Sequence, residues 1–148
     1  MVSTRKTRRE VSAGGVVFRR LDAGTEVALI GRADVHGERV WALPKGLVER
    51  RERTEEAALR EVREETGLDA TLVDNIGEVN YWYFSKEKVR IFKTVKFFLM
   101  ECTGGDTSNH DWEVAEVRWF PIDAAGVALA YKGEREIVQK AAEMLALI

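Results

Sequence analysis

The stretch from Leu43 to Leu68, LPKGLVERRERTEEAALREVREETGL, decides the fold, because it joins a glycine turn, a basic loop and a segment rich in carboxylates. Thr54 is a suitable N-cap, and Glu55 places negative charge where the helix dipole favours it. Gly67 suits the left-handed conformation that ends many helices. These signals predict a helix from Thr54 to Thr66, and its narrow apolar stripe predicts that the helix packs on a sheet.

Three glutamates of this helix, Glu61, Glu64 and Glu65, point the same way, since at 3.6 residues per turn they fall within an arc of roughly 100°. One interpretation is a solvated acidic face that Arg60 and Arg63 neutralise. Against it, Glu61 and Glu65 are like charges four residues apart, a repulsion of roughly a few tenths of a kcal/mol that a divalent cation would relieve. All-oxygen ligation favours Mg²⁺ or Mn²⁺ over zinc. Together with the glycine turn, the patch predicts a metal that joins carboxylates to phosphate oxygens.

The rest of the chain predicts an α+β fold with a mixed, mostly antiparallel sheet between helices. Predicted strands cover 11–18, 26–30, 41–43, 68–73, 76–84, 88–102 and 113–120, the first two forming a hairpin. A short helix over 124–130 is expected with Asp123 as its cap, and a terminal helix over 134–148 repeats apolar residues on one face.

Composition bounds the class of protein. The chain has 148 residues, 45% of them hydrophobic, and a formal net charge of −2, so it offers no overall field for duplex nucleic acid or anionic membranes. Residues 1–10 are basic and are expected to be a flexible terminus before a single domain over 11–148. The lone Cys102 is expected to be a small buried residue, and His36 and His110 to be solvated. A reducing, cytoplasmic setting fits, and no apolar run approaches the ~18 residues of a membrane span.

The central stretch resembles the signature of the Nudix hydrolases. Gly46, five residues, Glu52, seven residues and then REVREETGL at 60–68 reproduce it without a gap, nine fixed positions over 23 residues. The order of predicted strands and helices also matches the family over nearly the whole chain. The resemblance implies an α/β/α sandwich and an enzyme that uses water to cleave a nucleoside diphosphate linked to another group.

Site residues follow from the resemblance position by position. It implies that Glu61, Glu64 and Glu65 bind the metal, Mg²⁺ with Mn²⁺ as the alternative, together with the carbonyl oxygen of Gly46. The number of metal ions stays open.

The remaining signature residues are implied to orient the site or to move a proton. Arg60 and Glu52 match the pair that braces the loop against the helix. Glu64 is our choice for the general base, and Glu113, outside the motif, is the competing candidate.

Substrate choice depends on residues around the motif. Lys45 gives LPKG, which looks like the branches of the family that act on diadenosine tetraphosphate, diphosphoinositol polyphosphates and RNA 5′ ends. The runs at 77–84, 90–102 and 112–122 are similar to bacterial diadenosine tetraphosphate hydrolases. That similarity implies that Tyr81 stacks on adenine, that Lys93 contacts phosphate and that Glu113 supplies a further metal ligand. The alternative for Tyr81 is a position in the core, since at least one of the aromatic pairs in YWYF at 81–84 is expected there. The alternative for Lys93 is a solvated lysine on an edge strand.

The leading hypothesis is Mg²⁺-dependent cleavage of diadenosine tetraphosphate to ATP and AMP. Alternatives within the family are diphosphoinositol polyphosphates, nucleoside triphosphates that need sanitising, and RNA 5′ ends. A non-catalytic nucleotide-binding module is a hypothesis of a different class, for which a lost signature glutamate would be typical, and none is lost. The basic residues Arg50, Arg51 and Arg53 either neutralise the acidic helix or capture phosphate. A monomer and a homodimer both stay open.

Overall fold

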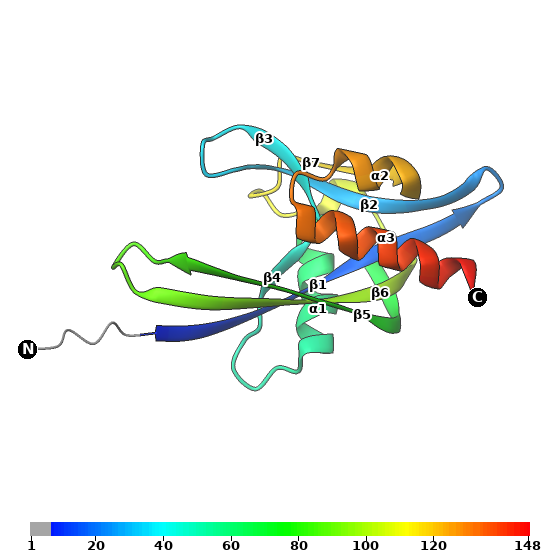
Figure 1. Cartoon of the computed structure of the whole chain (residues 1–148). Helices are drawn as coiled ribbons and strands as arrows, with labels where there is room; N and C mark the ends of the chain where they lie inside the picture. The colour runs from blue at the N-terminus through cyan, green and yellow to red at the C-terminus, as the bar shows by residue number, and fades with distance from the viewer. Residues whose placement is uncertain (1–6) are drawn as a thin grey trace, which may run out of the picture.

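The computed structural model describes residues 7–148, which form one sheet and the helices that cover it (Figure 1). The strands are β1 (Thr7–Leu21), β2 (Gly24–Ala33), β3 (Arg39–Ala42), β4 (Lys45–Leu47), β5 (Leu68–Phe84), β6 (Arg90–Gly105) and β7 (Glu116–Pro121). The helices are α1 (Thr54–Thr66), α2 (Ile122–Ala128) and α3 (Lys132–Ala146), with one 3-10 turn, η1 (Thr107–Asn109).

The sheet is mixed and mostly antiparallel, as predicted. Its strand order is β3-β2-β1-β6-β5, with β4 paired to β1 and β7 paired to β2. Only β1 and β6 run parallel among the described strand pairs. The expected hairpin of the first two strands is confirmed, with Phe18 opposite Val27.

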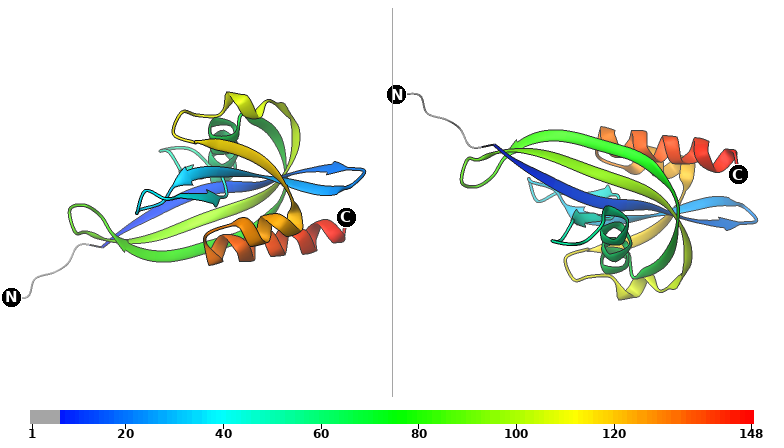
Figure 2. Two further views of the ribbon diagram at one scale, coloured as in Figure 1. Left: turned by 90° about the horizontal axis from the view of Figure 1, so that it is seen from above. Right: turned by 90° about the horizontal axis from the view of Figure 1, so that it is seen from below.

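Helices cover both faces of the sheet, with α1 on one face and α2 and α3 on the other (Figure 2). The α1 face is built from small residues of the helix, Ala57, Ala58 and Val62, packed on strand residues such as Ala13 and Phe98. Short side chains let the helix approach the sheet closely, which brings its carboxylates near the strand backbone. The α/β/α sandwich implied by the resemblance is therefore confirmed.

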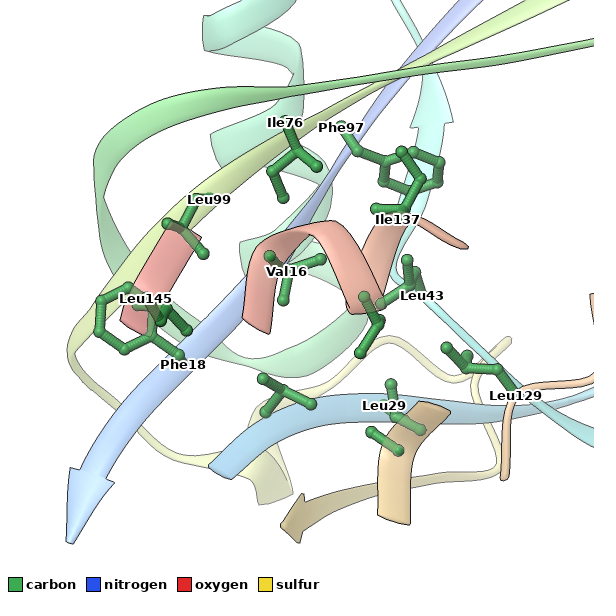
Figure 3. Close-up of a cluster of buried hydrophobic side chains, with 14 of the residues drawn as sticks. Val16, Phe18, Leu29, Leu43, Ile76, Phe97, Leu99, Leu129, Ile137 and Leu145 are labelled. Carbon is green, nitrogen blue, oxygen red and sulfur yellow. The ribbon is translucent and has the colours of Figure 1, made fainter. Parts of the chain in front are cut away.

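The larger core lies under α3. Ile137 and Leu145 of that helix meet Val16, Phe97 and Leu99 of the central strands (Figure 3). All five side chains are at most 6% exposed. At roughly 1.5–3 kcal/mol for each fully buried large apolar side chain, this packing fixes α3 firmly on the sheet.

The N-terminal prediction needs a correction. Thr7 to Glu10 are not a frayed end but the start of β1, because β6 supplies hydrogen-bonding partners from Arg90 onward. Arg9 also lies 5.6 Å from the centre of the Phe92 ring. The predicted flexibility of residues 1–6 falls outside the described part of the chain.

Several other predictions also change. The segments 68–73 and 76–84 are one strand, β5, whose register against β6 shifts at three places instead of breaking. The pair expected in the core at YWYF is absent, since Tyr81, Trp82 and Phe84 are 44%, 48% and 57% exposed. The paired strands there extend beyond the helices, so no layer covers them (Figure 1). Cys102 is only partly buried, at the edge of the α1 core.

The α-helix boundaries are close to the predicted ones, but two caps differ. The N-cap of α1 is Arg53, in extended conformation, because the first helical hydrogen bond runs from the Ala57 N–H to the Arg53 carbonyl. The N-cap of α2 is Pro121, so Asp123 lies in the first turn. No helix within residues 7–148 is long and apolar enough to cross a membrane.

Candidate active site

The site is built where β4 and the first turns after it meet α1. Gly67 ends α1 in the left-handed region at φ 77°, as predicted, and its N–H donates to the Arg63 carbonyl. At the other side, β4 pairs with β1, which places Gly46 opposite Ala13. Helix and strand are thus held together with the glycine between them.

Gly46 lies directly against the carboxylate of Glu61. A Cβ atom at position 46 would sit 2.1–2.3 Å from the three carboxyl atoms of Glu61, far inside van der Waals contact. Only glycine leaves this space, so the Gly46 main chain and the Glu61 carboxylate share one small volume. Burial is the largest influence on Glu61 and raises its pKa, although Arg60 opposes the rise.

Arg60 joins the basic loop to the helix. Its Nε and Nη2 donate to the two carboxylate oxygens of Glu52 at 2.7 and 3.0 Å, and Nη2 also donates to the Leu47 carbonyl at 3.0 Å. The hydrogen bonds from Arg60 lower the pKa of Glu52 to about 2. Its Nη1 donates to Glu61 at 2.8 Å and to Glu64 at 3.3 Å. Such bidentate pairing fixes orientation as well as charge, which suits a bracing residue.

Glu65 is the most buried of the three helix glutamates, at 8% exposed. Its Oε1 accepts the main-chain N–H of Lys45 at 2.8 Å, and its Oε2 lies 3.7 Å from Arg32. Burial outweighs both partners and raises the pKa of Glu65 to about 7, while the neighbouring Glu61 adds to the rise. A buried carboxylate that lacks a full counter-charge favours the arrival of a cation.

The donor set fits a hard divalent cation. Glu61, Glu64, Glu65 and the Gly46 carbonyl would hold it, and all are oxygen ligands of the kind that Mg²⁺ and Mn²⁺ prefer. Within residues 7–148 no three carboxylate, imidazole or thiol side chains are gathered into a complete ligand set. Arg60 donates hydrogen bonds to oxygens of both Glu61 and Glu64. A cation would compete with this guanidinium for the carboxylates.

A cavity of about 680 Å³ is lined by residues of β2, β4, β5, β6 and α3 and by the segments next to β2 and α3. Two of its lining residues, Arg32 and Lys45, are also the two that contact Glu65. The walls carry two tyrosines, Tyr81 and Tyr131, and apolar residues of the sheet. Its full lining is Arg32, Ala33, Asp34, Val35, Lys45, Val79, Tyr81, Val95, Phe97, Tyr131, Gly133 and Glu134. Cavities of this size with aromatic walls and a few polar groups accommodate small organic ligands.

The substrate residues predicted from the sequence divide into two groups. Tyr81 and Lys45 line the cavity. Lys93 does not line it, although it is the cross-strand partner of Tyr81. Lys93 is 8% exposed and its Nζ donates to Glu10 at 3.3 Å, an oxygen that also accepts the Tyr83 hydroxyl at 2.5 Å. The expected phosphate contact of Lys93 would have to replace this internal partner.

Glu113 lies in the segment between η1 and β7 and is exposed. Its main-chain N–H donates to Asp111 at 3.3 Å, and the Asp111 N–H donates to the Glu64 carbonyl at 2.7 Å. Among the described residues no hydrogen bond or ion pair joins the Glu113 side chain to the helix glutamates. The structure therefore brings its loop, but not its carboxylate, to the end of α1.

Three residues of the site were not predicted from the sequence. Arg32 contacts Glu65, Tyr131 lines the cavity, and Glu134 also lines it and is 4% exposed. Arg32 and Tyr131 stand in segments without a motif, so nothing in the local sequence marks them. For Glu134 the one signal is its place in the first turn of a helix, which is too common to indicate a site.

Comparisons with known proteins agree with this geometry. A model of the NUDIX domain matches residues 8–141. MutT4 of Mycobacterium tuberculosis (strain CDC 1551 / Oshkosh) is 42% identical over 147 residues, which cover 97% of this chain and 59% of MutT4. An 8-oxo-(d)GTP phosphatase of Mycolicibacterium smegmatis is 34% identical, covering 93% of this chain and 43% of that protein. This chain thus spans less than two thirds of the length of these relatives.

Solved structures show the same fold. A C. elegans Ap4A hydrolase in a binary complex superposes with a TM-score of 0.73 at 24% identity, covering 94% of this chain and 99% of that one. The E. coli dihydroneopterin triphosphate pyrophosphohydrolase gives a TM-score of 0.69 at 22% identity, covering 92% and 97%. Because the family model extends over most of the chain, with the complete signature on α1 and the loop before it, this protein belongs to the NUDIX domain family.

Proposed function

We propose that this chain is a divalent-metal-dependent pyrophosphohydrolase of nucleoside polyphosphates, with Mg²⁺ as its cation. The observation that carries the proposal is the continuity of cavity and carboxylates, since Arg32 and Lys45 line the cavity and both contact Glu65. A nucleoside in the cavity would have its phosphates beside the glutamates of α1. The complete set of signature glutamates supports turnover over binding alone.

The proposed hydrolysis assigns a different role to each of several residues. A cation held by Glu61, Glu64, Glu65 and the Gly46 carbonyl would lower the pKa of a bound water and neutralise charge on the phosphates. Glu64 is the proposed base, because its side chain is 49% exposed and contacts Arg60 only at 3.3 Å, which leaves it accessible to water. Water adds to one phosphorus and one proton of the water passes to Glu64, while the bond from that phosphorus to the bridging oxygen breaks and the bridging oxygen leaves with its electron pair on the second phosphate product. Arg60 and Glu52 keep the loop on the helix during this step.

Two substrates follow from different observations. Oxidised guanosine triphosphates are favoured by the relative named 8-oxo-(d)GTP phosphatase, at 34% identity over 93% of this chain. Diadenosine tetraphosphate, our hypothesis from LPKG and Tyr81, retains the support of a tyrosine in the cavity wall. Lys45 and Lys93, however, are both engaged by buried or partly buried glutamates. We therefore rank oxidised guanosine triphosphates first and diadenosine tetraphosphate second.

A substrate panel with chromatography of the products tests the proposal. The panel contains 8-oxo-dGTP, dGTP, diadenosine tetraphosphate and a 5′-triphosphorylated RNA, each with Mg²⁺ and with chelator. We expect 8-oxo-dGTP to give the monophosphate and pyrophosphate, faster than dGTP. Conversion of diadenosine tetraphosphate to ATP and AMP as the fastest reaction would reverse the ranking. Binding of these nucleotides without any product would leave the non-catalytic module as the function.

A further inference from the structure

Glu134 is a buried carboxylate outside the Nudix signature. It holds residues 43–45, which lead into β4 and the loop before α1. It lies in the first turn of α3 and is 4% exposed. Its Oε1 accepts the Leu43 main-chain N–H at 2.9 Å, and its Oε2 accepts the Lys45 ammonium group at 2.6 Å. Both oxygens of this carboxylate are therefore bound to one short piece of chain, on either side of Pro44.

Lys45 passes this contact on to the proposed metal site. While its ammonium group is on Glu134, its main-chain N–H donates to Glu65 at 2.8 Å. The next residue is Gly46, whose carbonyl is a proposed metal ligand. A continuous series of contacts thus leads from α3 through Lys45 to Glu65, and it crosses from one layer of the sandwich to the other.

The rest of the segment is also held tightly. The Pro44 carbonyl accepts the Gly15 N–H at 3.2 Å, and a Cβ at Gly14 would lie 2.2 Å from that same carbonyl oxygen. Strand β1 therefore bounds the segment on one side, and Glu134 bounds it on the other. The contact with β1 is made by main-chain atoms, whereas the ion pair between Glu134 and Lys45 is made by two side chains. The ion pair is therefore the contact that a side-chain substitution can remove.

We propose that Glu134 is a positioning residue for the metal site of the proposed hydrolase. By holding Lys45 at its ammonium group and Leu43 at its amide, it keeps the Lys45 N–H on Glu65 and the Gly46 carbonyl directed at the glutamates of α1. Groups that orient metal ligands from outside the ligand set typically contribute 10- to 100-fold to metal affinity. Since Glu134 acts through Lys45, we expect a value at the low end of that range.

Glu134→Gln is the informative variant. Its amide oxygen still accepts the Leu43 N–H, but its NH₂ group meets the Lys45 ammonium donor to donor, so that contact is lost. Titration calorimetry of the full chain with Mg²⁺ and with Mn²⁺ should show about tenfold weaker binding than in the unsubstituted protein. Glu136→Gln is the matched control, because the Glu136 side chain is on the same helix, 65% exposed, and paired with Lys132 at 3.9 Å on the surface. It should bind the metals like the unsubstituted protein.

The double variant Glu134→Gln, Lys45→Met shows whether Glu134 acts through Lys45. It should bind Mg²⁺ no more weakly than Lys45→Met alone, whereas multiplied losses would mean that the two residues act independently and would overturn the proposal. Metal binding by Glu134→Gln within twofold of the unsubstituted protein would overturn it too, whatever its stability in urea. If the single variants do not fold, the double variant still serves, because replacing both members of a buried pair is tolerated better than removing one. In that case, an Mg²⁺ affinity of the double variant equal to that of the unsubstituted protein would overturn the proposal.

This inference rests on the proposed function, yet the two can fail separately. Calorimetry of metal binding needs no substrate, so a chain that hydrolyses nothing can still show the tenfold loss. Conversely, a chain that hydrolyses its substrate while Glu134→Gln binds Mg²⁺ normally would keep the proposed function and remove the role of Glu134.

Discussion

Replacing Glu65 by glutamine should make the metal-free protein more stable while it removes most of the activity. Glu65 is 8% exposed, and burial raises its pKa from an ordinary value of 4.5 to about 7. Glutamine has nearly the same shape and keeps an oxygen for the Lys45 N–H, so the main difference is the buried negative charge. The change therefore isolates the electrostatic cost of this ligand.

The sign of the pH dependence follows from linkage. Folding raises the pKa of Glu65, so the folded protein retains a proton that the unfolded chain releases between about pH 4.5 and 7. This contribution to stability is complete below pH 4.5, falls as the pH rises to about 7, and stays low above. The difference between 4.5 and about 7, at ~1.4 kcal/mol per pH unit, corresponds to about 3 kcal/mol at pH 8. The glutamine variant has no such loss.

Urea unfolding of both proteins in chelator, from pH 4.5 to 8.5, measures this difference. We expect Glu65→Gln to match the unsubstituted protein at the acid end and to gain up to about 3 kcal/mol in the free energy of unfolding at pH 8. Glu64→Gln is the control, since a side chain 49% exposed should change stability by less than about 0.5 kcal/mol. A difference that does not vary with pH, or a loss of stability in Glu65→Gln at pH 8, would refute the reasoning. Turnover with Mg²⁺ should fall by orders of magnitude, and near-normal kcat would contradict the assignment of Glu65 as a metal ligand.

Three further predictions concern the remaining parts of the site. Gly46→Ala should lower kcat at least tenfold with an unchanged circular dichroism spectrum, because the new Cβ would lie 2.1–2.3 Å from the Glu61 carboxyl atoms; retention of full activity would show that Glu61 can move without consequence. Tyr81→Ala should raise KM by roughly fivefold or more in steady-state kinetics, because stacking on the base is lost. The Trp82 side chain contacts Phe92 and does not line the cavity, so Trp82→Ala should leave KM unchanged. Equal effects of the two substitutions would argue against stacking at Tyr81. Arg60→Lys should lower kcat, since lysine cannot hold Glu52, Leu47 and Glu61 at once, and excess Mg²⁺ in the assay should not restore the rate.

Local patterns in the sequence were sufficient for the catalytic helix. The spacing of Glu61, Glu64 and Glu65 follows from helical periodicity alone, and a left-handed glycine at position 67 is a property of the chain near the helix end. The boundaries of α1 are therefore as predicted, and Glu61 and Glu64 both accept hydrogen bonds from Arg60. The predicted N-cap is one residue too late, because the Arg53 carbonyl already accepts a helical hydrogen bond, from the Ala57 N–H.

The exposure of the aromatic segment YWYF at 81–84 could not be predicted from its sequence. Alternation in YWYF correctly separates Tyr81 from Trp82, but alternation does not tell whether any layer covers either face. The sheet extends past α3 at this point, so Tyr81 lines a cavity and Trp82 lies on the open side. The length of one element relative to another is a property of the assembled fold.

By itself the sequence determined which residues we propose for the reaction, because the signature is a continuous stretch whose geometry one helix and one turn supply. Tertiary structure alone decided what surrounds them. Glu134 reaches Leu43 across 91 positions of the chain and Lys45 across 89, and Thr7 to Glu10 become a strand only because β6 pairs with them. Contacts of this kind form when separate layers pack together, and no local pattern records them.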